Sequence, residues 1–126
     1  MSLQSPIARV RGLGSAKEGL HHWWVQRLTA VALVPLSLWF IYSLVSVTGA
    51  DYQTVRAWMG DTLNAALMLM FILSLYYHAA LGVQVVIEDY IDSEWQKIVC
   101  LILVKFLAWL AGLSAAIAVL KVYLGL

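Results

Sequence analysis

Hydrophobic residues fill three long stretches of the chain, and charged residues bound each stretch. The stretches run from about Leu28 to Thr48, from about Thr62 to Ile87 and from about Ile98 to Leu120. A helix needs roughly 20 residues to cross a hydrocarbon core of about 30 Å, because unpaired backbone groups are intolerable in lipid. The pattern therefore predicts an all-α membrane protein with transmembrane helices at residues 28–48, 62–87 and 98–120.

The composition supports a membrane protein. Of the 126 residues, 63% are hydrophobic and 12% are charged, and the mean hydropathy is +0.84. A soluble domain this small needs more charge on its exterior. We expect a single membrane-anchor domain over residues 1–126, with a segment at 1–27 that is too short for a separate soluble domain. The net charge of +1, without any basic run, argues against nucleic-acid binding.

Lysine and arginine are unevenly distributed around the predicted spans. The loop at 49–61 carries only Arg56, whereas four basic residues precede the first span: Arg9, Arg11, Lys17 and Arg27. The positive-inside rule then places the segment 1–27 in the cytoplasm. We expect a bacterial inner membrane, because the chain begins without a mitochondrial presequence rich in Arg and Ser. A chain encoded inside mitochondria remains an alternative.

Two ionisable side chains lie inside the predicted spans, His78 and Lys105. His78 precedes Glu88 by ten residues, which places it about 15 Å deep, near the middle of the bilayer. One interpretation is a neutral imidazole hydrogen-bonded to another helix, and the other is an axial haem ligand. Since the chain has one intramembrane histidine, the second ligand of a bis-histidine haem must come from a partner chain. For Lys105 we expect its long stem to reach the headgroups.

Small residues flank His78 on its own helical face. Gly82 follows and Ser74 precedes it by about one turn, so a flat macrocycle or another helix can approach the backbone there. A similar small-residue pattern in the third span predicts close helix packing, at Ala108, Gly112 and Ala116. Pro35 lies inside the first span, where it is expected to kink the helix without ending it.

Polar residues at both ends of the spans suggest further contacts. Asp89 falls within roughly 20° of the face of His78, and the neighbouring Tyr90 can donate a hydrogen bond to a quinone carbonyl. The alternative is a tyrosine in the interfacial aromatic belt. Before the first span, Arg27 can pair with a carboxylate such as a haem propionate, with His21 close by. The alternative there is an anchor at the membrane interface.

The run Tyr77–Tyr90 resembles the second-helix signature of the succinate dehydrogenase hydrophobic membrane anchor, the D-type subunit. The matching positions are His78, Gly82, Gln84, Asp89 and Tyr90. The segment Gly19–Ala30 is also similar to the start of that family's first helix. Size, helix number and the basic N-terminal segment extend the resemblance over almost the whole chain.

The resemblance implies a complex with a flavoprotein subunit, an iron–sulfur subunit and a second, C-type anchor subunit. It implies a b haem shared by the two anchors, with His78 as an axial iron ligand and with Arg27 and His21 near the propionates. It also implies a quinone site with Tyr90 and Asp89. We expect succinate oxidation with ubiquinone and no catalytic activity of the chain alone. The alternatives are the anchor of a fumarate reductase or menaquinone-linked enzyme, or a non-redox helical scaffold in which His78 only joins helices.

Overall fold

The computed structural model describes Ile7, Val10 and residues 17–126. Four helices form this part of the chain and no strand occurs in it: α2 (Lys17–Ser46), α3 (Tyr52–Gly60), α4 (Thr62–Tyr90) and α5 (Glu94–Tyr123). Three of them, over Leu20–Ser46, Thr62–Tyr90 and Glu94–Tyr123, are long and apolar enough to cross a membrane. The predicted all-α fold with three spans is confirmed. Arg9 and Arg11, used above for orientation, lie outside the described residues.

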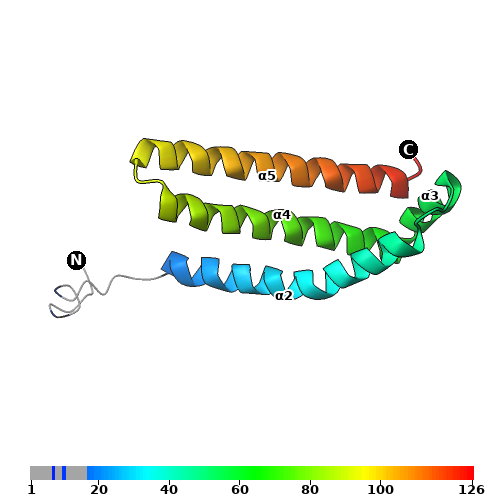
Figure 1. Ribbon diagram of the computed structural model, residues 1–126, viewed down its shortest axis with the longest axis horizontal. Coiled ribbons are helices and arrows are strands. Elements are labelled where there is room, and N and C mark those ends of the chain that lie inside the picture. Colours follow the sequence, from blue (N-terminus) through cyan, green and yellow to red (C-terminus); the bar gives the residue numbers. More distant parts are fainter. Residues whose placement is uncertain (1–6, 8–9, 11–16) are drawn as a thin grey trace.

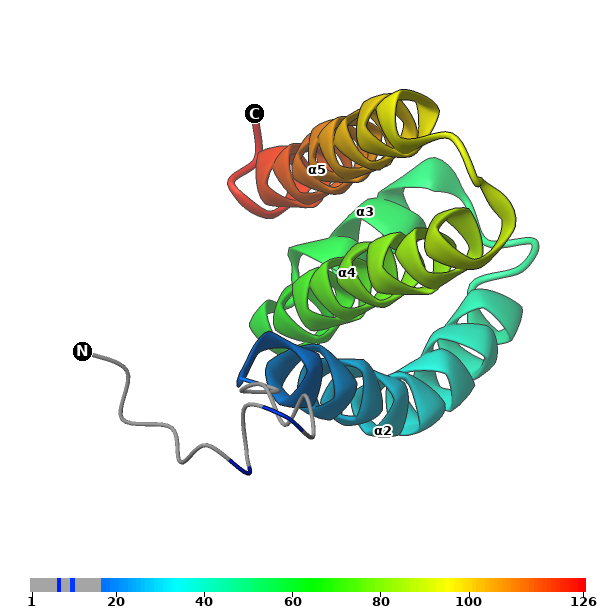
Figure 2. The ribbon, with the colours of Figure 1, turned by 90° about the vertical axis from the view of Figure 1, so that its left-hand side faces the viewer.

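Helix α4 lies between α2 and α5 and packs against both, whereas the backbones of α2 and α5 do not approach each other. The start of α2 and the α4–α5 loop lie at one end of this layer, which we call the loop end (Figure 1). Helix α3 and the C-terminus lie at the other, which we call the α3 end. Each long helix thus runs antiparallel to its neighbour (Figure 2).

The first long helix starts well before the predicted span, at Lys17, and ends at Ser46. It passes through Pro35 without interruption, and its axis bends near its middle (Figure 1). A proline inside a helix removes one backbone hydrogen bond and displaces the preceding turn. The expectation of a kink that does not end the helix is therefore confirmed.

Helix α3 occupies the loop at 49–61, where no helix was predicted. The Asp51 carboxylate caps it by accepting a hydrogen bond from the backbone N–H of Thr54 at 2.9 Å. Hydrogen bonds from the Thr54 side chain and backbone lower the pKa of Asp51. Asp61 caps α4 in the same way, accepting from the N–H groups of Leu63 and Asn64, each at 3.1 Å. Asp51 and Asp61, two acids in the loop between the first two predicted spans, thus begin two helices.

Most of the tightly packed side chains lie toward the α3 end. The buried cluster there comprises Ala65, Met68, Ile72 and Val119. Aromatic pairs join the helices around it: Phe40 stacks on Phe71 with ring centroids 4.8 Å apart, and Trp39 stacks on Trp58 at 6.1 Å. The half of α4 toward the loop end contributes only Ile87 to the buried residues. The chain's own side chains therefore fill the half that contains His78 much less completely.

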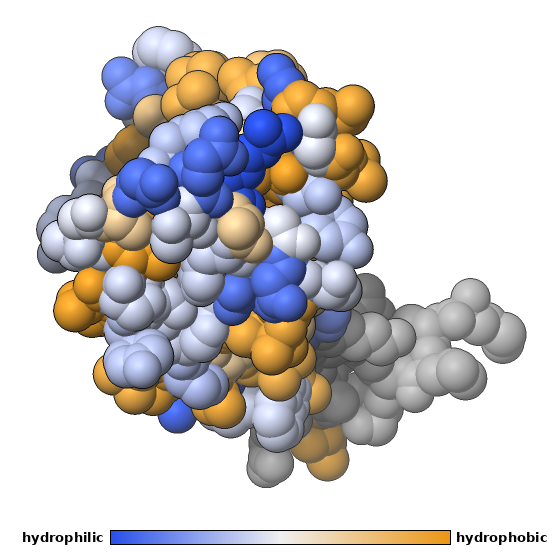
Figure 3. Space-filling view, turned by 90° about the vertical axis from the view of Figure 1, so that its right-hand side faces the viewer, coloured by the Kyte–Doolittle hydropathy of each residue, from blue (hydrophilic) through white to orange (hydrophobic). Residues whose placement is uncertain are grey.

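The sides of the helix layer are covered by exposed leucine, isoleucine, valine and aromatic side chains. A water-soluble protein rarely exposes apolar area on this scale, whereas a lipid-facing surface requires it. Figure 3, a view onto the α3 end, shows hydrophilic residues near its centre and hydrophobic residues around the rim. The arrangement is that of a multi-pass membrane protein whose polar ends face water.

Candidate functional site

His78 lies on α4 and is partly buried against α2. Its Nδ1 is 3.0 Å from the hydroxyl oxygen of Thr29. The same oxygen lies 2.8 Å from the carbonyl oxygen of Val25 and 3.1 Å from that of Gln26. The imidazole is thus held between two spans by a hydroxyl that is itself anchored to the backbone of its own helix.

The second ring nitrogen of His78, Nε2, has no hydrogen-bond partner among the described residues. On the same face of α4, a Cβ built on Gly82 would meet only the Gln26 amide nitrogen, at 3.9 Å. The helix that approaches Gly82 is therefore α2, at ordinary van der Waals distance. The side-chain amide oxygen of Gln26, Oε1, is buried there without a hydrogen-bond partner among the described residues. The small residues around His78 were expected to admit either a macrocycle or another helix. At Gly82 the structure shows another helix, α2.

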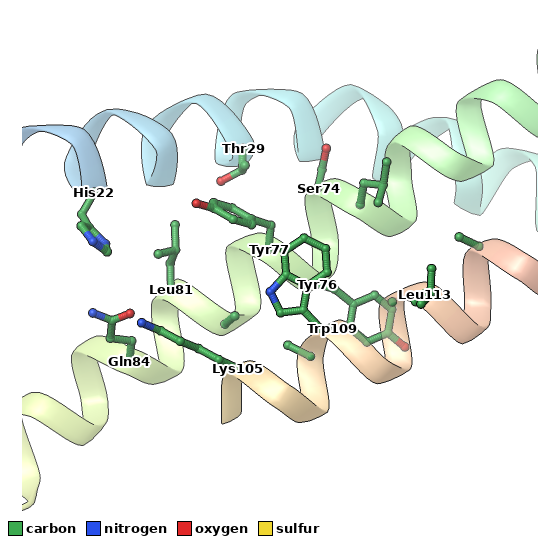
Figure 4. Close-up of a pocket in the computed structure, with 15 residues that line it drawn as sticks. His22, Thr29, Ser74, Tyr76, Tyr77, Leu81, Gln84, Lys105, Trp109 and Leu113 are labelled. Atoms are coloured by element: carbon green, nitrogen blue, oxygen red, sulfur yellow. The ribbon is translucent and has the colours of Figure 1, made fainter. Parts of the chain in front are cut away.

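A cavity of about 620 Å³ lies between α2, α4 and α5, and it is mostly apolar. Its polar lining side chains include Thr29 and, toward the loop end, His22, Gln84 and Lys105 (Figure 4). The Gln84 amide nitrogen donates to Glu88 Oε1 at 2.7 Å, one turn along its own helix. The amide oxygen of Gln84 is buried and has no partner within the described residues. Figure 4 shows the Lys105 side chain extended toward Gln84. His78 does not line this cavity.

Arg27 and His21 are exposed at the start of α2. The Arg27 guanidinium lies 5.0 Å from the centre of the Trp23 ring and has no carboxylate partner in the described part of the chain. Thr29 follows Arg27 by two positions, which is about 200° around a helix, so the two side chains leave α2 on opposite sides. The structure therefore brings Thr29, rather than Arg27 or His21, to His78. Sequence reasoning missed Thr29, whose only signal was its place in the family's first-helix segment.

Tyr90 is the last residue of α4 and 82% of its surface is exposed. It lines an open depression of about 570 Å³ with the first turns of α5, including Trp95 and Cys100. Asp89 is also exposed but does not line the depression. Its carboxylate has no ion-pair partner within residues 20–126, where Lys97 and Glu94 form the one salt bridge, at 3.8 Å. Both groups are thus accessible at the loop end.

The donor set around His78 is compatible with a haem. Within the described ranges, no three His, Cys, Asp or Glu side chains gather in a way that could hold a bare metal ion. A haem iron takes four ligands from its porphyrin and needs only axial ligands from protein. The His78 imidazole, whose Nε2 has no hydrogen-bond partner in the part of the chain that the structure describes, meets that need from this chain.

These features define a three-span helical anchor with a single interhelical histidine and accessible polar groups at one end. The comparison with known sequences is more specific: residues 1–112 match the family described as Succinate dehydrogenase/Fumarate reductase transmembrane subunit. The chain belongs to that family. The resemblance noted in the sequence is confirmed.

Curated relatives cover most of the chain. The succinate dehydrogenase hydrophobic membrane anchor subunit of Rickettsia bellii is 35% identical over 116 residues, which is 92% of this chain and 93% of the relative. That of Rickettsia conorii is 34% identical over 81% and 82% of the two chains. The succinate dehydrogenase membrane anchor subunit of Reclinomonas americana is 33% identical over 73% and 79%. No solved structure matches the chain significantly.

Proposed function

We propose that this chain is the smaller, D-type membrane anchor of a succinate dehydrogenase, and that residues 1–126 act as one membrane domain. Its partners are a flavoprotein subunit, an iron–sulfur subunit, a second, C-type anchor and the surrounding lipid. The observation that carries the proposal is His78, which Thr29 holds at 3.0 Å between two spans and whose Nε2 has no partner among the described residues. The relatives' names favour the succinate dehydrogenase assignment over a fumarate reductase or menaquinone-linked anchor.

His78 would hold a b haem through its Nε2, together with a residue of the second anchor. Such a haem, when bound, provides a one-electron redox centre inside the membrane. In the half of α4 that contains His78, Ile87 is the one buried residue, which supports contact there with groups from outside this chain. Arg27, whose guanidinium has no carboxylate partner among the described side chains, pairs with a propionate from the outer side of α2, with His21 nearby.

Tyr90 and Asp89 contribute to a ubiquinone site at the loop end. The exposed Tyr90 hydroxyl donates a hydrogen bond to a quinone carbonyl. Asp89 directly precedes Tyr90, and its carboxylate relays a proton toward the quinone oxygen that is reduced. The chain thus positions the quinone, while the oxidation of succinate belongs to the soluble subunits.

The proposed orientation places the loop end in the cytoplasm of a bacterial inner membrane. The basic residues before the first span support it, and Arg27 with the neighbouring tryptophans is suited to the headgroup region. This end also carries Tyr90, so the quinone site would lie on the side where the soluble subunits dock.

The function can be tested by purifying the complex through a tagged copy of the chain in mild detergent. We expect three further subunits to co-purify and a reduced-minus-oxidised spectrum with a b-type Soret band. His78→Ala should remove that band. His22→Ala is the matched control, because His22 lines the neighbouring cavity and is not a proposed ligand. An unchanged band in His78→Ala, or its equal loss in both variants, would contradict the haem assignment.

A further inference from the structure

The Thr29 hydroxyl lies within hydrogen-bonding distance of three groups but has only one proton to donate. The three partners are the Val25 carbonyl at 2.8 Å, the Gln26 carbonyl at 3.1 Å and the His78 Nδ1 at 3.0 Å. Carbonyl oxygens can only accept, whereas an imidazole nitrogen can donate or accept according to the tautomer. The position of the single hydroxyl proton therefore determines which nitrogen of His78 carries a proton.

If the hydroxyl donated to His78, its oxygen would face the two carbonyl oxygens without a proton between them. Lone pairs would then oppose each other at 2.8 Å and 3.1 Å. If it donates to the nearer carbonyl instead, the contact with His78 is satisfied by Nδ1–H donating to the Thr29 oxygen. This arrangement satisfies the two shorter contacts of the hydroxyl and leaves only the 3.1 Å contact with the Gln26 backbone carbonyl without a proton of its own. Donation to His78 would leave both carbonyls without one, so donation to the Val25 carbonyl is the more stable arrangement.

We propose that Thr29 is a positioning residue that fixes His78 as the Nδ1–H tautomer and leaves the Nε2 lone pair open for a metal. A neutral imidazole binds metal only through the nitrogen that lacks a proton. A hydrogen bond from the other nitrogen also sets the ring orientation and raises the basicity of the ligand. The tautomer is a property of this chain by itself, and its use as a haem ligand depends on the proposed function.

The bond also links the ring to the packing of two helices. Thr29 and His78 are 49 residues apart in sequence and lie on α2 and α4. Because the hydroxyl is tied back to its own helix, Thr29 has little freedom to follow the ring if α4 rotates. The orientation of His78 is thus set by the relative rotation of the two spans, before any cofactor binds.

The first test is ¹⁵N NMR of the full-length chain in micelles without haem, with the His78 signals assigned by their absence in His78→Ala. We expect Nδ1 protonated and Nε2 unprotonated. Thr29→Val should abolish that preference and Thr29→Ser should keep it. Thr48→Val is a matched control, because Thr48 also donates to its own helix region, the Leu44 carbonyl at 2.9 Å, but is exposed. A protonated Nε2 in the native chain, or an unchanged tautomer in Thr29→Val, would overturn the proposal.

The second test uses the assembled complex and the midpoint potential of its haem. Thr29→Val should raise the potential, because a less basic ligand stabilises the ferric state less, while Thr29→Ser and Thr48→Val should stay near the native value. An unchanged potential in Thr29→Val at native haem content would contradict the proposal. A complex without b haem would remove the proposed function alone, since the tautomer in the haem-free chain still decides the role of Thr29.

Discussion

Gly112 on α5 is the position where one added methyl group should separate two spans most clearly. A Cβ built there would lie 3.3 Å from both Cβ and Cγ of Tyr76 on α4 and 3.4 Å from its Cδ2. Carbon atoms pack best at about 3.5–4.0 Å, so a few tenths of an ångström are missing. The atoms in contact are the root of the tyrosine side chain, which cannot swing away without moving the backbone or changing rotamer.

Overpacking of this kind costs about 1–3 kcal/mol, and replacing glycine by alanine in a helix returns up to about 1 kcal/mol. We therefore expect Gly112→Ala to destabilise the α4–α5 packing by about 1 kcal/mol, or roughly fivefold in the unfolding equilibrium constant. Gly112→Val should cost more, because its branches enter the same contact. Gly82→Ala is the matched control, since its Cβ would meet only an amide nitrogen at 3.9 Å.

The assay is equilibrium unfolding of the full-length chain in mixed detergent and SDS micelles, followed by far-ultraviolet circular dichroism. Gly82→Ala should be as stable as the native chain or slightly more stable. Overpacking at Gly112 is refuted if Gly112→Ala is at least as stable as the native chain. It is also refuted if Gly82→Ala loses as much free energy of unfolding as Gly112→Ala.

Three further predictions concern the polar groups. Tyr90→Phe should lower quinone reduction while succinate oxidation by a soluble dye survives, and equal loss of both activities would count against a quinone role. Arg27→Gln should lower the haem midpoint potential, because a positive charge near the iron favours the ferrous state, whereas Arg27→Lys should stay close to native; a redox titration measures both. Hydrogen bonds from Thr54 lower the pKa of Asp51 below its ordinary value of 3.8. The Asp51 carboxylate therefore stabilises α3 fully above pH 3.8, and this stabilisation is lost as the pH falls through the lowered pKa. Circular dichroism should show this acid loss of helix in the native chain and not in Asp51→Asn.

The three spans could be predicted because lipid imposes one requirement, backbone hydrogen bonding inside an apolar helix of sufficient length. The ends were harder to predict. Helix α2 begins at Lys17, since charged and aromatic residues at the membrane interface are compatible with helix outside the hydrocarbon core. Helix α3 was missed because its nine residues are too few and too polar to read as a span. Its signal was present in Asp51, which follows the first apolar stretch and is a residue type that favours an N-cap.

The site was less predictable than the fold. The depth of His78 follows from counting residues, but its partner depends on how α2 and α4 rotate against each other, which no local pattern contains. Thr29 was therefore not singled out as a partner of His78. Gln84 was singled out only as a position of the motif, and the structure shows it donating to Glu88 on its own helix. Sites built across helices need the packing as well as the motif.

The most direct test of His78 as a haem ligand held by Thr29 is a density map of the purified complex at a resolution that shows the ring of His78. We predict a haem iron coordinated by Nε2 of that ring and by an imidazole of the second anchor, with Thr29 still hydrogen-bonded to Nδ1. Iron bonded to Nδ1, or a His78 ring facing lipid with no haem beside it, would contradict the account.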